Sequence, residues 1–377
     1  MHEIIDPVLR IHVGKKAVCT LALAFFAITA CAPVSEKPEK LEEQELVFPP
    51  PPEPARYYFE RTIRSSNDIE IEDRSASWRR VLTGETTTAI GFSKPFDVVV
   101  CQGRIYVSDT VRRTVLMFNV PAGQVTQIGD EDPGMLRKPL GIAADSNCNL
   151  YVADGTANSV LIYDQDGKFI RTIGGGDSFD RLSYVETDPD GQRIYCVDTG
   201  GVDSERHQVR VFDVQSGKHL FDFGSRGEGP GQLNLPRDIA MGPDRRLYVV
   251  DGGNFRIQVF EIDGRYVKQI GAIGVRPGQF SRPKGVDTDA DGNIYVSDAA
   301  FGNFQIFNAD GELLLFVGSR SEIPAPAKFL LPAGLAVDED GRVYMTDQFF
   351  RKVDVFRPAA LGPNQGFLGA RTSTPSQ

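Results

Sequence analysis

The chain has 377 residues, of which 41% are hydrophobic and 24% are charged, and its formal net charge is −10. Its 38 Gly and 24 Pro favour a fold with many turns over a helical one. An acidic chain without a local basic patch repels phosphates, so we expect no nucleic-acid partner. Of the five Cys, only Cys101, Cys148 and Cys196 follow residue 31, which excludes a disulfide framework as the basis of the fold.

The first 31 residues predict a lipoprotein signal peptide. Lys15 and Lys16 precede an apolar run at 17–28, which would span about 18 Å as a helix and is too short for a hydrocarbon core of about 30 Å. The run ends in Ile28-Thr29-Ala30-Cys31, which resembles the lipobox of bacterial lipoproteins. The resemblance implies that Cys31 is acylated and becomes the new N-terminus; a cleaved signal with an incidental Cys is the alternative.

Residues 32–55 are predicted to form a linker between this anchor and a folded body. They contain Glu and Lys runs and end near Pro49–Pro52, a composition typical of a solvated, semi-rigid spacer. Ala32 after the lipobox favours the outer membrane, so we expect a lipid-anchored protein of the bacterial cell envelope. The folded domain is expected at 56–358, and a tail rich in Gly, Pro, Ser and Thr, expected to be disordered, at 359–377.

Six segments of the folded domain align with one another, and their closing Asp residues lie about 44 to 53 residues apart. Each contains a strand, a turn with Asp, Gly or Asn, and an apolar second strand that ends in Asp. A third strand follows, and in most units a fourth. Four short antiparallel strands repeated six times predict an all-β, six-bladed β-propeller. The segments are 94–109, 138–154, 182–198, 235–251, 282–298 and 331–347.

The last unit lacks a fourth strand, because Arg357-Pro358 and the tail follow its third strand. Tyr57–Ile63 is an isolated alternating strand ahead of the first unit. We predict that it completes the sixth blade and closes the ring. The competing segment, Trp78–Leu82, is predicted to be a short helix that stops at Gly84.

The repeated pattern resembles the NHL repeat family over residues 94–356. The motifs that carry the resemblance are Pro-x-Gly-[Ile/Val]-x-x-Asp, [Ile/Leu]-Tyr-Val-x-Asp, and the segments 229–236, 254–260 and 278–283. Two units depart from it: Leu182-Ser183 has no Pro, and 351–355 lacks the Arg-Ile-Gln core of 256–258. The resemblance implies a six-bladed propeller.

One segment offers a calcium site as an alternative to a simple hairpin turn. Asp287, Asp289, Asp291 and Asp298 have the spacing of a calcium-binding loop with a Gly turn. The same register recurs at 188–191 and 338–341, so the hairpin turn of the blade is the favoured interpretation. The six closing Asp residues are likewise expected to bond their own blade. No other cofactor is expected.

An enzyme is the less favoured class. Only His207 and His219 lie outside the leader, and two His cannot supply the three-His zinc site of the amidating lyases that share this architecture. No Gly-x-Ser-x-Gly or His-Glu-x-x-His motif is present. The alternative that stays open is a metal-dependent, calcium-type hydrolase or lyase with a carboxylate site at the channel mouth, as in propeller lactonases.

The loops between second and third strands emerge on one rim and combine Phe with Arg, a composition typical of interfaces. We therefore expect a monomeric, membrane-anchored scaffold that binds a protein or peptide partner there; packing of some Phe between blades is the alternative. The rim residues are Arg112, Arg113, Arg206, His207, Phe255, Phe301, Phe349, Phe350 and Arg351.

The three remaining Cys lie in blades. Cys101 and Cys148 lie near the first hairpin turns of adjacent blades, but their offsets from the following Tyr differ, so the sequence leaves their pairing open. Cys196 lies inside a strand and is expected to be a buried free thiol.

Overall fold

The computed structural model describes residues 45–69 and 89–369. Cys31, the signal peptide, most of the predicted linker and Trp78–Leu82 lie outside these residues, so their interpretations stay predictions. The described residues fall in one compact unit that begins at Glu45, and no helix among them is long and apolar enough to cross a membrane.

Five blades are four-stranded antiparallel sheets in which the strands follow one another in chain order. Blade 1 contains β3 (Pro95–Cys101), β4 (Arg104–Asp109), β5 (Thr114–Asn119) and β6 (Gln124–Ile128), and blade 2 contains β7 (Pro139–Ala144), β8 (Leu150–Asp154), β9 (Ser159–Tyr163) and β10 (Phe169–Gly174). Blade 3 contains β11 (Leu182–Thr187), β12 (Arg193–Asp198), β13 (Gln208–Asp213) and β14 (His219–Phe223), and blade 4 contains β15 (Pro236–Met241), β16 (Leu247–Asp251), β17 (Arg256–Phe260) and β18 (Tyr266–Ile270). Blade 5 contains β19 (Pro283–Thr288), β20 (Ile294–Asp298), β21 (Asn303–Phe307) and β22 (Leu313–Val317).

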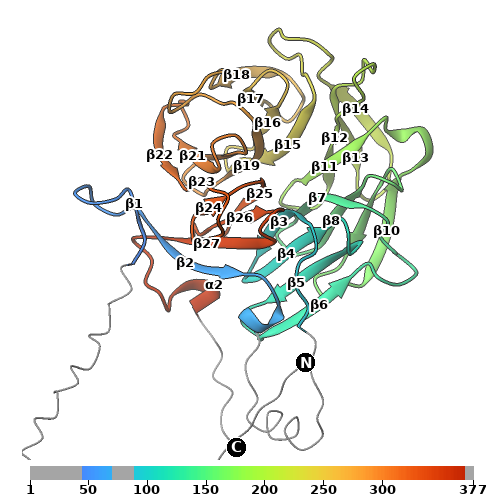
Figure 1. The fold of residues 1–377 in the computed structure, drawn as a ribbon. Helices are drawn as coiled ribbons and strands as arrows, with labels where there is room; N and C mark the ends of the chain where they lie inside the picture. The colour runs from blue at the N-terminus through green and yellow to red at the C-terminus, as the bar shows by residue number, and fades with distance from the viewer. Residues whose placement is uncertain (1–44, 70–88, 370–377) are drawn as a thin grey trace, which may run out of the picture. The chain divides into compact units, whose positions relative to one another are not determined.

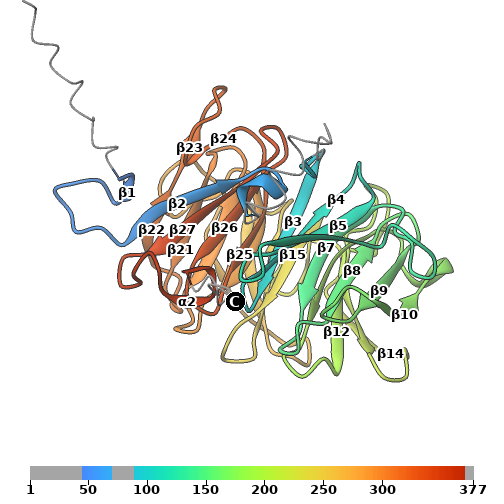
Figure 2. The ribbon, with the colours of Figure 1, turned by 90° about the horizontal axis from the view of Figure 1, so that it is seen from below.

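The sixth blade joins the two ends of the described chain. Its first three strands are β25 (Pro332–Val337), β26 (Val343–Asp347) and β27 (Lys352–Pro358), and its fourth is β2 (Tyr57–Ile63). Ile63 pairs with Val353, and Tyr57 pairs with Pro358. Figures 1 and 2 show β2, in blue, lying along β27, in red. The prediction that this strand closes the ring is confirmed.

Several short strands, turns and a short helix lie outside the four main strands of the blades. β1 (Val47–Phe48) pairs with β2 at the outer edge of blade 6, within the segment expected to be linker. β23 (Ser319–Arg320) and β24 (Lys328–Phe329) pair in the connection from blade 5 to blade 6. Two 3-10 turns, η1 (Ser66–Asp68) and η2 (Gly176–Ser178), follow blades 6 and 2. α2 (Gly366–Gly369) lies in the segment expected to be a disordered tail, and its Leu368 is buried.

The hydrophobic core lies between blades. Its six clusters each combine residues of two neighbouring blades, so that every blade has a packed neighbour on both faces. The second and third strands supply most of these residues, and β8, β16, β20 and β26 are buried along their whole length. Six first strands, β3, β7, β11, β15, β19 and β25, contact one another in a circle around the central axis.

Strand alternation gives the ring two distinct faces. The connections between blades and the loops from second to third strand lie on one face, which we call the linker face. The two hairpin turns of each blade lie on the other, the hairpin face. The closing Asp residues end the second strands at the linker face, and all six are fully buried.

Each closing Asp joins the linker to its own blade, as expected. One carboxylate oxygen of Asp109 accepts hydrogen bonds from the backbone N–H groups of Ser93 and Lys94, and the other accepts them from Val111 and Arg112. Equivalent bonds recur at Asp154, Asp298 and Asp347. A buried carboxylate with several N–H donors is satisfied without a metal or a counter-ion.

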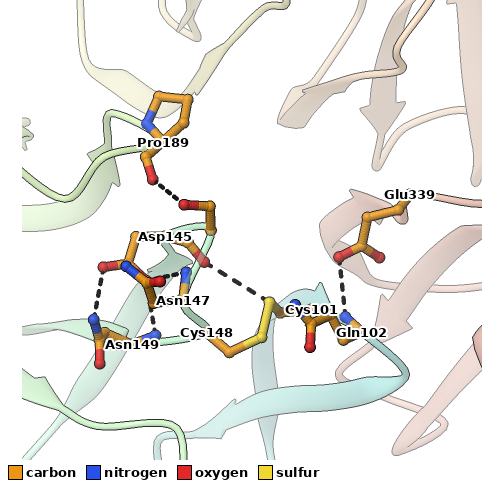
Figure 3. The surroundings of a disulfide bond; sticks show 9 residues. Cys101, Gln102, Asp145, Asn147, Cys148, Asn149, Pro189 and Glu339 are labelled. Atoms are coloured by element: carbon orange, nitrogen blue, oxygen red, sulfur yellow. Dashed lines mark hydrogen bonds between the residues drawn. A yellow bond between two sulfur atoms is a disulfide. The ribbon is translucent and has the colours of Figure 1, made fainter.

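A disulfide joins the first hairpins of blades 1 and 2, which resolves the question that the sequence left open. Cys101 and Cys148 have Cα atoms 5.7 Å apart. Figure 3 shows the bond between β3 and the turn that Asp145 organises, with Glu339 of blade 6 accepting a hydrogen bond from the backbone of Gln102. Cys196 is a buried free thiol, as expected.

Ring closure predicts a measurable role for Ile63, which is fully buried between blades 6 and 1. Ile63→Ala should lower the free energy of unfolding by about 2 to 5 kcal/mol, because a buried methyl-rich side chain is removed from a packed interface. Arg61→Ala, at a partly exposed position of the same strand, should cost less than about 1 kcal/mol. Denaturant unfolding measures both; equal losses would contradict this role of β2.

Candidate functional site

A cavity of about 600 Å³ occupies the central channel. Residues of all six first strands line it, from Asp97 and Asp238 in the middle of the ring to Gln102, Ser146 and Glu339 on the hairpin face. Phe367 of α2 also lines this end. Its backbone N–H donates to Asp340, which fixes the C-terminal segment beside the opening.

Six carboxylates line the cavity. Four of them, which we call the channel carboxylates, stand on four different first strands, whereas Asp145 and Glu339 lie in hairpin turns. Asp97 on β3 and Asp238 on β15 are buried, at 4% and 6% exposure. Glu186 on β11 and Asp287 on β19 are partly exposed, and they lie two positions further along their strands in the repeat register. Because alternate residues of a strand share one face, both pairs point toward the axis, at two levels.

These side chains also connect neighbouring blades. Asp97 accepts a hydrogen bond from the N–H of Ile142 at 2.9 Å, and Asp238 accepts one from Val286 at 2.9 Å. Asp287 accepts from Val337 at 2.7 Å. Each acceptor therefore bonds the first strand of the following blade.

Glu186 also accepts a hydrogen bond from the first strand of the following blade, but over a longer distance. Its Oε2 accepts from Met241 at 3.3 Å, while its Oε1 accepts from Thr187 at 2.6 Å. Among the described residues none of the four channel carboxylates forms a salt bridge. Their negative charge is offset by backbone dipoles alone.

Burial without a cation raises the pKa of every channel carboxylate. The pKa of Asp97 and of Asp287 rises to about 7, and that of Glu186 to about 8, mainly because burial disfavours the charged form. The pKa of Asp238 is raised well above its ordinary value by burial and by the charge of Asp97. Asp97, Asp287 and Glu186 therefore exchange protons near neutral pH, as general acids and bases must.

Two aromatic rings from different first strands lie next to each other near the carboxylates. Phe96 of β3 and Tyr184 of β11 have ring centroids 5.5 Å apart. They reach across blade 2, where a Cβ on Gly141 would lie only 2.3 Å from the Tyr184 ring. Glycine is therefore required at this position, because a larger side chain would collide with the Tyr184 ring.

The predicted rim residues all lie on the linker face, but their exposure differs. Phe349 is 60% exposed and packs edge-on against Phe350, which is partly buried. Phe255 and Phe301 are partly buried, which agrees with packing for these two. Arg113 and Arg351 are exposed.

Three rim residues have partners within the propeller. His207 is buried; its Nε2 lies 3.0 Å from the carbonyl oxygen of Gly201, and its Nδ1 accepts the N–H of Leu235. Arg112 donates from Nε to the carbonyl oxygen of Gly91. Arg206 forms an exposed ion pair with Asp180 at 3.1 Å. His207 thus organises the longest loop of blade 3 rather than presenting an imidazole to a partner.

The structure separates the four residues of the candidate calcium loop. Asp287 bonds across to blade 6, while Asp298 bonds the linker at the opposite face. Asp289 organises the hairpin, accepting from the backbone of Asp291 and Asn293 and from the Tyr295 hydroxyl. No group of three or more His, Cys, Asp or Glu within residues 45–69 and 89–369 could hold a metal ion.

Three of the channel carboxylates were not singled out as site residues from sequence. The signal lay in the repeat itself: Asp97 and Asp238 occupy the position where Gly141, Gly285 and Gly334 stand in Pro-x-Gly. At these two positions the repeat thus replaces a small residue with a carboxylate, which places an ionisable group in the channel. Asp287 was singled out, but for its spacing to Asp289 rather than for its place in the channel.

Comparison with known proteins agrees with this architecture. A family model described as NHL repeat matches residues 233–260, which contain β15, β16 and β17. The chain is a six-bladed β-propeller that carries an NHL repeat.

Solved structures share the fold at low sequence identity. A protein of unknown function from Bacteroides thetaiotaomicron is 16% identical, with a TM-score of 0.58 over 79% of this chain and 76% of its own. A gluconolactonase from Xanthomonas campestris is 20% identical, with a TM-score of 0.53 over 71% and 86%. Virginiamycin B lyase from Staphylococcus aureus is 13% identical, with a TM-score of 0.51 over 70% and 95%. Such identities show the fold alone.

The raised pKa values predict that stability falls as pH rises from 5.5 to 8.5. In this range the native state holds protons on Asp97, Glu186 and Asp287 that the unfolded chain has already released, since unfolded carboxyls titrate near pH 4. The contribution is full below the unfolded pKa values and is lost through about pH 7 to 8. The lowered pKa of Lys284, about 8, acts mainly above this range.

Glu186→Gln should flatten this pH dependence, because the amide does not titrate. Asp310→Asn, an exposed carboxyl at the β21–β22 hairpin, should leave the slope unchanged. Thermal unfolding across the pH range measures the slope independently of each variant's absolute stability. An unaltered slope in Glu186→Gln would show that this group is not coupled to folding.

Proposed function

We propose that the protein is a lipid-anchored component of the bacterial cell envelope whose propeller binds a protein or peptide partner on its linker face. The observation that carries this proposal is the exposure of large apolar side chains on that face. They are Val111, Met135, Val202, Ile273, Val275, Ile323 and Phe349, with exposed fractions from 49% to 82%.

A water-soluble surface contains scattered apolar residues. Here seven of the thirteen large apolar residues that are exposed in the described part of the chain lie in loops and linkers on one face of the ring. Val275 and Ile273 lie in one linker, and Phe349 lies in the second-to-third loop of blade 6. Preorganised loops bind with little ordering cost, which favours recognition by this face.

The described contacts also fit an exported protein. The Cys101–Cys148 disulfide suits an oxidising compartment such as the periplasm. The third Cys of the folded domain, Cys196, is buried and thus protected from oxidation. The described chain begins beside β1 at the outer edge of blade 6.

Replacing linker-face apolar residues should abolish partner capture. We expect Val275→Ser/Phe349→Ser to lose the proteins that wild type enriches when crosslinked in intact cell envelopes, because the buried apolar contact is removed. Ile170→Ser/Leu314→Ser, on the exposed outer strands β10 and β22, is the matched control and should retain them. Quantitative mass spectrometry compares the three sets of captured proteins, and identical sets would contradict the proposal.

Loss of the proposed acylated residue should release the protein from membranes. Cys31→Ser should move the protein from the detergent phase into the aqueous phase of a detergent partition.

A second function, acid–base hydrolysis or elimination in the channel, is favoured by the partly exposed pair Glu186 and Asp287. Their pKa values near neutrality allow one to receive a proton while the other gives one. In lactone hydrolysis the base would deprotonate the attacking water and the acid would protonate the departing ring oxygen. Propellers of the same architecture include a gluconolactonase and a lyase.

Hydrolysis of glucono-1,5-lactone, followed by pH-stat, tests this second function with and without added Ca²⁺. If the channel is catalytic, Glu186→Gln and Asp287→Asn should each lower kcat by about 100-fold, since general acid–base catalysis contributes that much or more. Glu322→Gln, an exposed carboxyl on the linker face, should have no effect. A wild-type rate equal to that of the channel variants would rule out catalysis of this reaction by the pair.

A further inference from the structure

Four cationic residues lie at the linker-face ends of three neighbouring first strands, a position that we call the mouth. Arg237 and Lys284 are the second residues of β15 and β19, each directly after the Pro that begins the strand, and both are partly buried. Arg181 and Arg282 directly precede β11 and β19 and are exposed. β15 lies between β11 and β19 in the ring, so the four cations occupy three consecutive blades.

These cations have no acidic partner. Within the described residues, none of the four forms a salt bridge or donates a side-chain hydrogen bond. The other buried cations of the propeller are paired, as in Arg256 with Asp251 at 2.8 Å and Arg342 with Glu60 at 2.8 Å. A cluster of like charges that is retained without compensation costs stability unless a ligand offsets it.

The pKa values of Lys284 and Arg237 are consistent with cations that lie close to one another. The pKa of Lys284 falls to about 8, first because of burial and then because of the positive charges of Arg237 and Arg282. Burial and the neighbouring arginines Arg282 and Arg181 also lower the pKa of Arg237. The charges of both Arg237 and the channel carboxylates Asp97 and Asp238 act on the Tyr184 hydroxyl, in opposite directions. None of the four cations lines the cavity that holds these carboxylates, so the mouth is a distinct site.

The surroundings of the mouth restrict which anion can reach it. Exposed acidic side chains lie on the linkers and loops further out, and they repel a long polyanion or a flat anionic surface. A short anionic group that enters along the axis avoids them. The outer acids are Asp130, Glu131, Asp132, Asp177, Asp203, Glu205, Glu228 and Glu322.

We propose that the mouth formed by Arg181, Arg237, Arg282 and Lys284 binds a carboxylate of an acidic peptide segment in the partner. This inference rests on the proposed function and names the chemistry of the partner. Guanidinium groups bind carboxylates with paired, charge-assisted hydrogen bonds. Ile273 and Val275, in the linker that leads to Arg282, supply exposed apolar surface for the residues that flank the carboxylate.

Binding of fluorescein-labelled hexaglutamate, measured by fluorescence anisotropy at low salt, tests the site. We expect Arg237→Gln/Lys284→Gln to raise the Kd at least about tenfold, because charge-assisted bonds are lost. Arg245→Gln/Lys168→Gln removes two exposed charges from the hairpin face and should change the Kd less than about twofold. Lys284→Arg, which keeps the charge, should retain binding, and hexaglutamine should not bind.

Several results would overturn the inference: no binding of hexaglutamate, equal weakening by the hairpin-face control, or tighter binding of oligothymidylate or phosphatidylglycerol vesicles through the same two residues. Failure of the proposed function is distinguishable. If hexaglutamate does not bind but Val275→Ser/Phe349→Ser still loses the captured partner, only the anion site is wrong. If hexaglutamate binds but partner capture survives that substitution, the anion site stands and the linker-face partner does not.

Discussion

A four-stranded blade has two apolar faces to bury, and only a closed ring gives each face a neighbour. Here closure depends on β2, which lies near the start of the described residues and pairs with β27 near their end. Ile63 then enters the cluster between blades 6 and 1, and Tyr57 enters the one between blades 5 and 6, where its hydroxyl lies 2.8 Å from that of Tyr295. A blade left with three strands would expose an edge and leave two interfaces incomplete.

Closure of the ring fixes the surroundings of each side chain on the first strands. Their side chains alternate between a neighbouring blade and the axis, and the axis is narrow enough for residues of opposite blades to interact. Small residues such as Gly141 and Gly334 are therefore common there, and Asp97 and Asp238 are costly. The cost is met by backbone N–H groups of the following blade, which turns a desolvated charge into a connection between blades.

The fold could be predicted from the sequence because the repeat specifies it locally six times over. The turn residues, the apolar second strand and the closing Asp recur, and the missing strand of blade 6 left one free alternating segment to supply it. The site could not be predicted in the same way, because proximity across the axis depends on ring diameter and strand tilt. His207 illustrates the limit: its rim position was visible, but its burial depends on the loop that folds back to Gly201. The pairing of Cys101 with Cys148 also depends on local backbone geometry that the sequence does not show. The two hairpins turn through left-handed residues, Gln102 and Cys148, which compensate for their different sequence offsets.

The structure places positive and negative side chains of the first strands at different positions along the channel. Carboxylates with raised pKa values line the cavity on the hairpin-face side, and cations that have no acidic partner among the described residues lie at the linker-face ends of the first strands. A ligand that enters from the hairpin face meets proton donors and acceptors in an enclosed volume. A ligand that approaches the linker face meets fixed positive charge beside exposed apolar loops. Enclosure suits chemistry on a small molecule, whereas an open, preorganised face suits a macromolecular partner. The two faces can therefore act independently on one rigid ring, and binding at one need not disturb the other.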